Sequence, residues 1–358
     1  MTTFYYISVL LVGIITSGFL VFLFHKLAEP LGLIDTPCER KAHNGNIPVV
    51  GGMVVYLSSA IMMLYFLENS VSRNLLLIAT AIIVFIGVLD DKYDLTVRSR
   101  LIGQSLVSLI LIAGLEKHFF HLGDLFSLGF HIELHSFGIP FTVLAVLAVI
   151  NAFNMIDGID GLLGLVSTIF FIALGLQAIQ IGNDFILITC LVFVACLIPF
   201  LMANLGFKPV GNKKIFMGDA GSMFMGLSIV WLTVESTQGT QPIVRPVTVL
   251  FFVALPIIDM VAIIIRRLKK RKSPFVADRD HIHHIFMRGG LTPKLTLLIL
   301  VSFSLLSAAF GLILEFINAP DIMILLAFGS LCLAYSIMVL HSWKFCKWLR
   351  ARIPQPSK

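Results

Sequence analysis

Long apolar runs, each close to the length that crosses a lipid bilayer, recur along this chain and constrain its fold more than any other feature. A transmembrane helix needs about 20 consecutive, mostly apolar residues. By this criterion the sequence predicts eleven helices, at residues 3–24, 47–67, 74–89, 101–115, 137–153, 162–181, 185–204, 221–235, 245–265, 295–316 and 322–342. With 58% hydrophobic and 13% charged residues, a soluble domain is excluded. We therefore expect an all-α integral membrane protein, a polytopic bundle of about eleven transmembrane helices.

The Lys and Arg residues are distributed unequally between the two sides of this predicted bundle. All but three of the 26 fall on alternate connections; the exceptions are Arg73, Lys117 and Arg245. Because basic residues accumulate in cytoplasmic loops, the N-terminus should lie outside and the C-terminus in the cytoplasm. The net charge of +6 thus reflects topology. Because topology accounts for these basic residues, nucleic acid is not an expected partner.

Three carboxylates follow the third predicted helix in the stretch LDDKYD, namely Asp90, Asp91 and Asp94. A helix C-terminus carries a partial negative charge and favours cations. The negative charge of carboxylates at this position must therefore be balanced by a metal ion or by a basic group. An exposed acidic loop is the alternative interpretation.

The connection after the fifth predicted helix reads NAFNMIDGIDGL, with Asn151, Asn154, Asp157 and Asp160 at every third position. Residues three apart are neighbours on a helix, and a tighter turn would align all four along one edge. A polar turn that caps the next helix is the alternative, but such a turn does not require four amide and carboxylate groups.

The eighth predicted helix opens with IFMGDAGS, which places Asp219 among small residues at a helix start. Asp is a favoured N-cap residue, so capping alone is one interpretation. The other is a metal-binding carboxylate beside a bound phosphate at a helix N-terminus.

Basic and imidazole groups occupy two further cytoplasmic connections. DRDHIHH contains Arg279, His281, His283 and His284, a combination suited to binding a diphosphate. RKAH contains Lys41 and His43, which could anchor the chain at the lipid or contact phosphate. Asp259 is a carboxylate inside a predicted span and therefore a candidate functional residue, although the sequence does not indicate its partner.

These motifs all fall on one side of the predicted bundle, which indicates a single site. We expect one polytopic domain over residues 1–358 with its site on cytoplasmic loops, followed by a basic cytoplasmic tail at 343–358. The loops are 25–46, 90–100, 153–161, 205–221 and 266–294. Carboxylates with Arg, Lys and His suit Mg²⁺-assisted phosphoryl transfer between a water-soluble anionic donor and a membrane-embedded acceptor. A secondary transporter is the rival hypothesis, but its charges should lie near the bilayer midplane on repeated halves.

The stretches LDDKYD, NAFNMIDGIDG, IFMGDAGS and DRDHIHH, with RKAH upstream, resemble the polyprenyl-phosphate N-acetylhexosamine-1-phosphate transferases of glycosyltransferase family 4. The form of the histidine stretch is more similar to the branch that transfers GlcNAc-1-phosphate to undecaprenyl phosphate than to the phospho-MurNAc-pentapeptide transferases. The resemblance implies UDP-GlcNAc as donor, undecaprenyl phosphate and the bilayer as partners, and UMP as a product. It further implies a bacterial inner-membrane location and a role in the first lipid-linked step of polysaccharide synthesis, such as that of O-antigen. Assembly as a homodimer is left open.

The resemblance also implies roles for individual residues. Asp219 and Asn154 match Mg²⁺ ligands, with Mn²⁺ as a substitute metal. The matched catalytic positions are Asp90, Asp91, Asp157, Asp160 and His281, of which Asp90 is favoured as the group that deprotonates or positions the lipid phosphate. The matched substrate-binding positions are Lys41, His43, Asp94, Asn204, Phe216, Arg279, His283 and His284, with Phe216 expected to stack on uracil. We favour direct attack by the lipid phosphate over a covalent aspartyl intermediate, because a phosphate oxygen is already a competent nucleophile.

Overall fold

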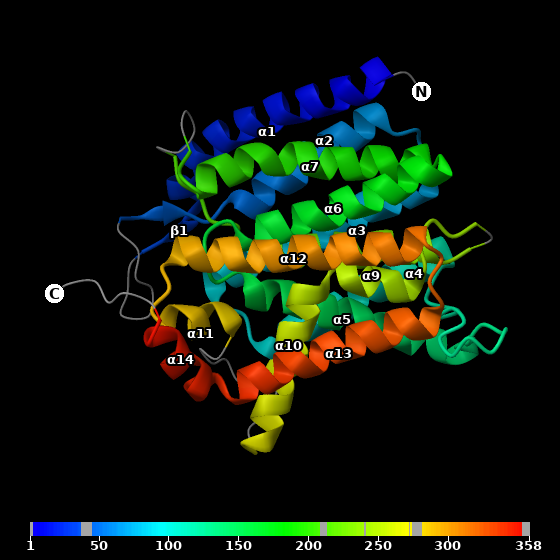
Figure 1. Cartoon of the computed structure of the whole chain (residues 1–358). Helices are drawn as coiled ribbons and strands as arrows, with labels where there is room; N and C mark the ends of the chain where they lie inside the picture. Colours follow the sequence, from blue (N-terminus) through cyan, green and yellow to red (C-terminus); the bar gives the residue numbers. More distant parts are fainter. Residues whose placement is uncertain are drawn as a thin grey trace. The chain divides into compact units, whose positions relative to one another are not determined.

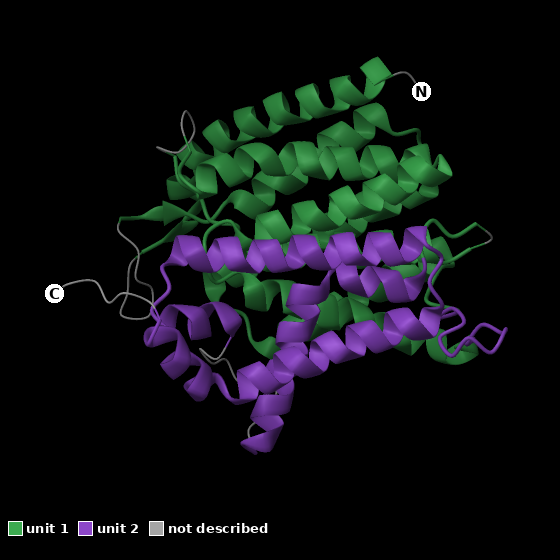
Figure 2. Cartoon of the chain, viewed as in Figure 1, with its two compact units in different colours: residues 1–120, 134–244 green, residues 121–133, 245–358 purple. Residues whose placement is uncertain are grey.

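The computed structural model describes residues 3–36, 45–207, 213–239, 241–271, 273 and 281–352 of the chain. It divides into two compact units, coloured separately in Figure 2. Unit 1 comprises Met1–Phe120 and Leu134–Val244, and unit 2 comprises His121–Glu133 and Arg245–Lys358. The expected sites at Lys41, His43 and Arg279 lie outside the described residues.

Unit 1 contains eight α-helices, a short 3₁₀ helix and two short strands within its described residues. The helices are α1 (Thr3–Leu31), α2 (Gly51–Phe66), α3 (Val71–Tyr93), α4 (Val97–Leu115), α5 (Gly138–Ile156), α6 (Leu162–Ile181), α7 (Asp184–Asn204) and α8 (Gly218–Thr237), with η1 at His135–Phe137. Three helices begin at a capping side chain, because Ser70, Thr96 and Asn183 each accept the backbone N–H three residues ahead.

Helix α8 is the most deeply buried helix of unit 1. It packs against α2, α3 and α5. Helix α7 lies between α1 and α6 (Figure 1). Ser222, Ser228 and Ser236 of α8 are all buried. Small and hydroxyl side chains suit a helix that contacts protein on all sides, since they allow close backbone approach. The first turn of α8 is therefore held from several directions.

Backbone hydrogen bonds tie the start of α2 to the segment before α8. Strand β1 (Ile34–Asp35) pairs with β2 (Ile47–Pro48), and Phe216 donates its N–H to the carbonyl of Pro48 at 2.8 Å. In return, the carbonyl of Phe216 accepts the N–H of Gly51 at 2.9 Å. These backbone bonds fix where α8 begins.

Unit 2 is also helical. Its helices are α9 (Pro246–Phe252), α10 (Ala254–Lys269), α11 (Ile282–Arg288), α12 (Pro293–Phe316), α13 (Asp321–Leu340) and α14 (Ser342–Arg350). Helices α9 and α10 meet at a bend of 87°. The predicted basic tail from residue 343 begins within α14.

The prediction of an all-α polytopic membrane protein is confirmed, and each of the eleven predicted segments overlaps a helix. Among the described residues, eight helices are long and apolar enough to cross a bilayer, and the α9–α10 pair would be a ninth. Helix α2 is shorter, at 16 residues, and α8 is made less apolar by its small and polar residues. The count of eleven spans and the orientation of the termini stay predictions.

Candidate active site

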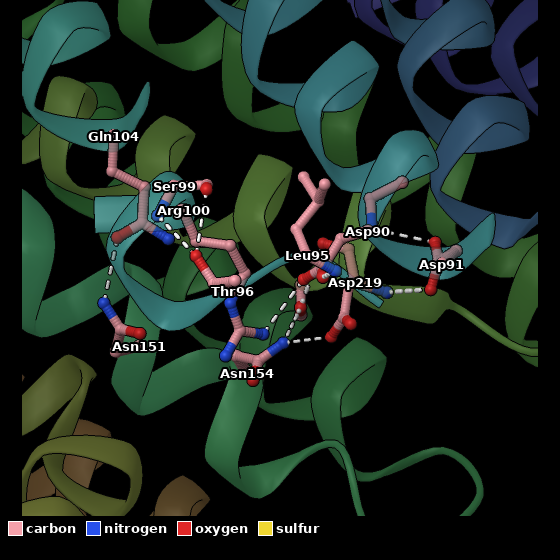
Figure 3. A network of polar contacts seen from close by, with 12 residues as sticks. Asp90, Asp91, Leu95, Thr96, Ser99, Arg100, Gln104, Asn151, Asn154 and Asp219 are labelled. Carbon is pink, nitrogen blue, oxygen red and sulfur yellow. Dashed lines mark hydrogen bonds and ion pairs between the residues drawn. The ribbon is translucent and has the colours of Figure 1, made fainter. Parts of the chain in front are cut away.

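The end of α3 places Asp90 in a buried position where each of its carboxylate oxygens accepts a hydrogen bond. Its side chain accepts the N–H of Leu95 at 2.8 Å and pairs with Nη1 of Arg100 at 2.9 Å (Figure 3). Asp94 ends the helix with a left-handed backbone (φ 53°), so the chain turns back at once and α4 returns Arg100 to Asp90. The negative charge of Asp90 at this helix end is therefore balanced, at least in part, by the guanidinium of Arg100.

The neighbouring Asp91 caps helix α8 from outside that helix. One of its carboxylate oxygens accepts the N–H of Asp219 at 2.8 Å, and the other accepts the N–H of Ala220 at 3.1 Å (Figure 3). A carboxylate at a helix N-terminus satisfies free N–H groups and complements the helix dipole. Gly218 permits this approach, because it has a φ of +74° and a Cβ there would lie 2.6 Å from the Asp91 carboxylate.

Asp219 lies in the first turn of α8 but does not cap it. The N-cap position is Met217, which makes no side-chain capping bond. The interpretation of Asp219 as only an N-cap is thus wrong, because Asp91 performs that function. The Asp219 carboxylate instead faces the end of α5, where the Asn154 amide contacts it (Figure 3). The same amide donates to the Ser222 hydroxyl at 2.9 Å.

The regular spacing of NAFNMIDGID does not produce one continuous edge of four polar groups. Helix α5 ends at Ile156, and Asn151 turns away to donate to Gln104 of α4 at 3.0 Å (Figure 3). Only Asn154 of the two asparagines reaches Asp219. Asp157 and Asp160 lie in the turn between α5 and α6.

Asp157 lies close to other acidic side chains of the site. Its side chain reaches solvent, yet desolvation by the surrounding protein, followed by the carboxylates of Asp219, Asp91 and Asp160, raises its pKa to about 8. Exposure and desolvation are compatible here, because a side chain can touch water on one side and protein on the others. This cluster is therefore suited to a cation.

Two side chains organise the turn that carries Asp160. Asp160 pairs with Nζ of Lys214 at 2.6 Å, and this lysine also lies 5.3 Å from the centroid of the Phe216 ring. Buried Asn204 accepts the N–H of Gly161 at 2.6 Å and donates to the carbonyl of Ile215 at 2.8 Å. Asn204 thus positions the turn relative to the start of α8, and its predicted contact with a nucleotide stays a prediction.

The histidines of DRDHIHH belong to unit 2, at the start of α11. Nδ1 of His281 lies 2.8 Å from a carboxylate oxygen of Asp259, which identifies the partner that the sequence could not indicate. His283 is 1% exposed, and within the described parts of the chain neither of its ring nitrogens has a hydrogen-bond partner. Burial, then the imidazoles of His284 and His281, lowers the pKa of His283 to about 3. His283 is therefore uncharged at neutral pH.

Comparison of the sequence with known proteins identifies the family of this chain. The sequence model of glycosyl transferase family 4 matches residues 74–237, from α3 to the end of α8. A protein of Salmonella typhi is 36% identical over 92% of this chain and 90% of its own length. Proteins of Escherichia coli strain K12 and Pasteurella multocida strain Pm70 are 36% and 37% identical over 94% and 93% of this chain, and over 91% and 94% of their own lengths. All three are named undecaprenyl-phosphate alpha-N-acetylglucosaminyl 1-phosphate transferase.

This chain belongs to glycosyl transferase family 4. The resemblance noted from the motifs is confirmed, and the region matched by the family contains every contact described above among Asp90, Asp91, Asn154 and Asp219.

The site of this family 4 chain fits a hard cation with few protein ligands. Among the described residues, no three His, Cys, Asp or Glu side chains are grouped so that they could hold a metal ion. Mg²⁺ does not need such a group, since one or two carboxylates with substrate phosphates and water are its usual ligands. Asp219 with the amide of Asn154, beside the carboxyl group of Asp157, provides that kind of set.

Two residues of the site were missed by reasoning from the sequence. The sequence indicates Arg100 only as one of the basic residues on the cytoplasmic side, yet in the structure it forms an ion pair with Asp90. Ser222 follows Asp219 by three positions and bonds to Asn154. Its place in GDAGS was a usable signal, because positions three apart on a helix lie on the same face.

We expect Gly87→Ala to disrupt the site through the backbone. A Cβ at Gly87 would lie 2.3 Å from Cα of Ala220 and 2.6 Å from its nitrogen, so α3 and α8 would have to separate beside the Asp91 cap. Overpacking of this kind costs about 1–3 kcal/mol. Thermal unfolding in detergent should show the loss of stability. Gly329→Ala in α13 is the matched control, since nothing lies within 4 Å of its Cβ; equal stability of the two variants would contradict this account.

Proposed function

We propose that this chain transfers GlcNAc-1-phosphate from UDP-GlcNAc to undecaprenyl phosphate, giving undecaprenyl-diphospho-GlcNAc and UMP. The names of its relatives support this reaction. The single structural observation that carries it is the placement of Asp219, whose backbone is held by Asp91 and whose carboxylate contacts Asn154. The proposed location is a bacterial inner membrane, with the site facing the cytoplasm and the N-terminus outside.

Asp219 and Asn154 are the proposed ligands of Mg²⁺, with Mn²⁺ as an expected substitute. The chemistry that a bound Mg²⁺ supplies is neutralisation of negative charge on the phosphate groups. The chain itself contributes rigidity, because the Asp91 cap fixes the backbone of Asp219 before substrate binds. Such preorganisation is effective in phosphoryl transfer, where little covalent work is left to the protein.

The structure suggests a revised role for Asp90. Both of its oxygens accept hydrogen bonds, from Leu95 and Arg100, and these contacts are those of a group that fixes the position of the Arg100 guanidinium. We propose that Asp90 holds Arg100, and that the guanidinium orients an anionic oxygen of the lipid phosphate. In the reaction, an oxygen of that phosphate bonds to the β-phosphorus of UDP-GlcNAc, and UMP leaves with the bridging oxygen.

The remaining residues are proposed to bind the donor. Phe216 would stack on uracil, and its neighbour Lys214 would add positive charge near the nucleotide. Asp157 and Asp160 would face the nucleotide or the metal. The proposed contacts to diphosphate and sugar come from cytoplasmic loops and are Lys41, His43, Asp94, Arg279, His281, His283 and His284, of which His283 would act as a neutral group.

The proposed reaction is tested by measuring UMP release from purified protein with undecaprenyl phosphate and Mg²⁺. UDP-GlcNAc, UDP-GalNAc and UDP-MurNAc-pentapeptide should be compared as donors. We expect UMP with UDP-GlcNAc only, and none when the lipid is omitted. Turnover with the pentapeptide donor alone would assign the chain to the other branch of the family. Absence of lipid-dependent UMP with every donor would refute the proposed function.

The raised pKa of Asp157 predicts proton release when Mg²⁺ binds. Below pH 8 the Asp157 carboxyl is mostly protonated, and a nearby cation favours the ionised form, so binding should displace a proton. The apparent Mg²⁺ affinity should therefore rise with pH and level off above about pH 8. Titration calorimetry at pH 7 in two buffers with different ionisation heats measures the released proton. Asp157→Asn should reduce the buffer dependence, and the remainder should come from Asp91, whose pKa burial and the Asp219 carboxylate raise to about 7. A wild-type heat that is equal in both buffers would disprove the prediction.

A further inference from the structure

The carboxylate of Asp259 is enclosed within helix α10. The side chain is 0% exposed, and α10 belongs to the bent helix pair that is apolar enough to cross a bilayer. An ionisable group in such a position is expensive to bury and is retained where it has a partner and a role. Nothing in the proposed reaction described above uses it.

Three hydrogen-bonding groups from two parts of unit 2, the start of α11 and α13, converge on this carboxylate. One oxygen, Oδ1, accepts the hydroxyl of Tyr335 in α13 at 2.8 Å and the N–H of Ile282 at 3.2 Å. The other, Oδ2, lies 2.8 Å from Nδ1 of His281. The N–H of Ile282 can only donate, so Oδ1 must accept.

This pattern determines the tautomer of His281. Two donors occupy Oδ1, so Oδ2 is the acceptor left for the imidazole, and a hydrogen on Nδ1 of His281 completes the pattern. The remaining ring nitrogen, Nε2, is then the one available to another molecule. Within the described residues Nε2 is not among the buried unpaired atoms, and His281 retains 7% exposure.

We propose that Asp259 is a positioning residue that, with Tyr335, holds His281 in the Nδ1–H tautomer so that Nε2 accepts a hydrogen bond or a proton from substrate. The inference rests on the proposed function, in which His281 acts on the donor. A carboxylate that orients an imidazole through Nδ1 is a recurrent means of fixing the reactive nitrogen. Here the ring lies at the start of α11 and the carboxylate in α10, and Tyr335 prevents the carboxylate from rotating.

Asp259→Asn is the informative substitution, because it keeps the shape of the side chain but replaces the acceptor that faces His281 with a hydrogen-bond donor. The two donors at Oδ1 require the carbonyl oxygen of Asn to take that position. The amide NH₂ then faces Nδ1 of His281, which must become an acceptor, and the hydrogen moves to Nε2. We expect kcat for UMP formation to fall on the order of 10²- to 10⁴-fold, with KM for UDP-GlcNAc nearly unchanged. Tyr335→Phe should lower kcat about tenfold, because the carboxylate loses one of two restraints on Oδ1.

The decisive readout is nitrogen NMR of His281 in the full-length labelled protein, since protonated and bare ring nitrogens resonate at separate frequencies. Spectra recorded at a pH where the ring is neutral should show Nδ1–H in the wild type and Nε2–H in Asp259→Asn. On a His281→Ala background, Asp259→Asn should cause no further loss of activity. Asp321→Asn is the control, because Asp321 is another buried carboxylate of unit 2, paired with Arg245 at 2.9 Å; its His281 signals should match those of the wild type.

The outcomes separate the two proposals. An unchanged tautomer in Asp259→Asn, or a full further loss on the His281→Ala background, would overturn the positioning role even where the transferase activity is present. Absence of transferase activity in the wild type would refute the proposed function, while the NMR signals would still decide whether Asp259 sets the tautomer.

Discussion

Asp219→Asn should lower UMP formation by about 10³-fold or more while the protein remains folded. The substitution removes the negative charge of the proposed metal ligand, and loss of that ligand forfeits several kcal/mol of charge stabilisation. It keeps the backbone N–H of residue 219, so the cap from Asp91 survives. The measurement is the initial rate over a wide range of Mg²⁺ concentrations, in which any residual activity should require more metal than the wild type.

The matched control for this prediction is Asp184→Asn. Asp184 also lies in the first turn of a helix, α7, and accepts a hydrogen bond from Tyr6 at 2.7 Å. It has no part in the proposed site, so its loss should leave the rate within a few fold of the wild type. A rate for Asp219→Asn comparable to that of Asp184→Asn would remove Asp219 from the mechanism.

Asp91→Asn should be nearly as damaging, for a different reason. Both oxygens of Asp91 accept N–H groups of α8, and an Asn side chain must direct its own NH₂ at one of them. Loss of a helix cap costs about 0.5–2 kcal/mol, and we expect a fall in activity on the order of 10²-fold, because Asp219 loses its fixed position. Thermal unfolding and the rate of UMP formation measure the two effects separately.

A second capping variant distinguishes lost stability from lost positioning. Ser70 caps α3 by accepting the N–H of Arg73 at 3.1 Å, and it is not part of the proposed site. Ser70→Ala should lower stability by a similar amount and leave the rate almost unchanged. If both variants lose activity in proportion to their stability, the proposed positioning by Asp91 is refuted.

The sequence predicted the fold class well because lipid imposes a simple requirement. Apolar runs of sufficient length must be helical in a bilayer, and each of the eleven predicted runs overlaps a helix. Hydropathy could not show that α8 would be enclosed by other helices, because burial in protein and burial in lipid favour similar residues. Hydropathy also could not show the bend of 87° between α9 and α10, because apolar residues continue through it.

The sequence predicted which residues form the candidate site, but not which hydrogen bonds join them. The motifs identified Asp90, Asp91, Asn154 and Asp219, which the structure brings together around Asp219. Electrostatics also predicted that carboxylates at the end of α3 need compensation. Electrostatics did not predict that the N-terminus of α8 provides this compensation for Asp91, because the hydrogen bond joins residues 128 positions apart. The pairing depends on helix packing, for which sequence periodicity contains no information.

The most direct test of the account is the fate of the β-phosphate of UDP-GlcNAc. A donor radiolabelled in that phosphate should be incubated with purified protein, undecaprenyl phosphate and Mg²⁺, and the lipid and aqueous products separated. We expect the label to move into the lipid together with GlcNAc, and unlabelled UMP to be released. Sugar in the lipid with the label left behind in water-soluble UDP would contradict this expectation, because the chain would then transfer the sugar without its phosphate.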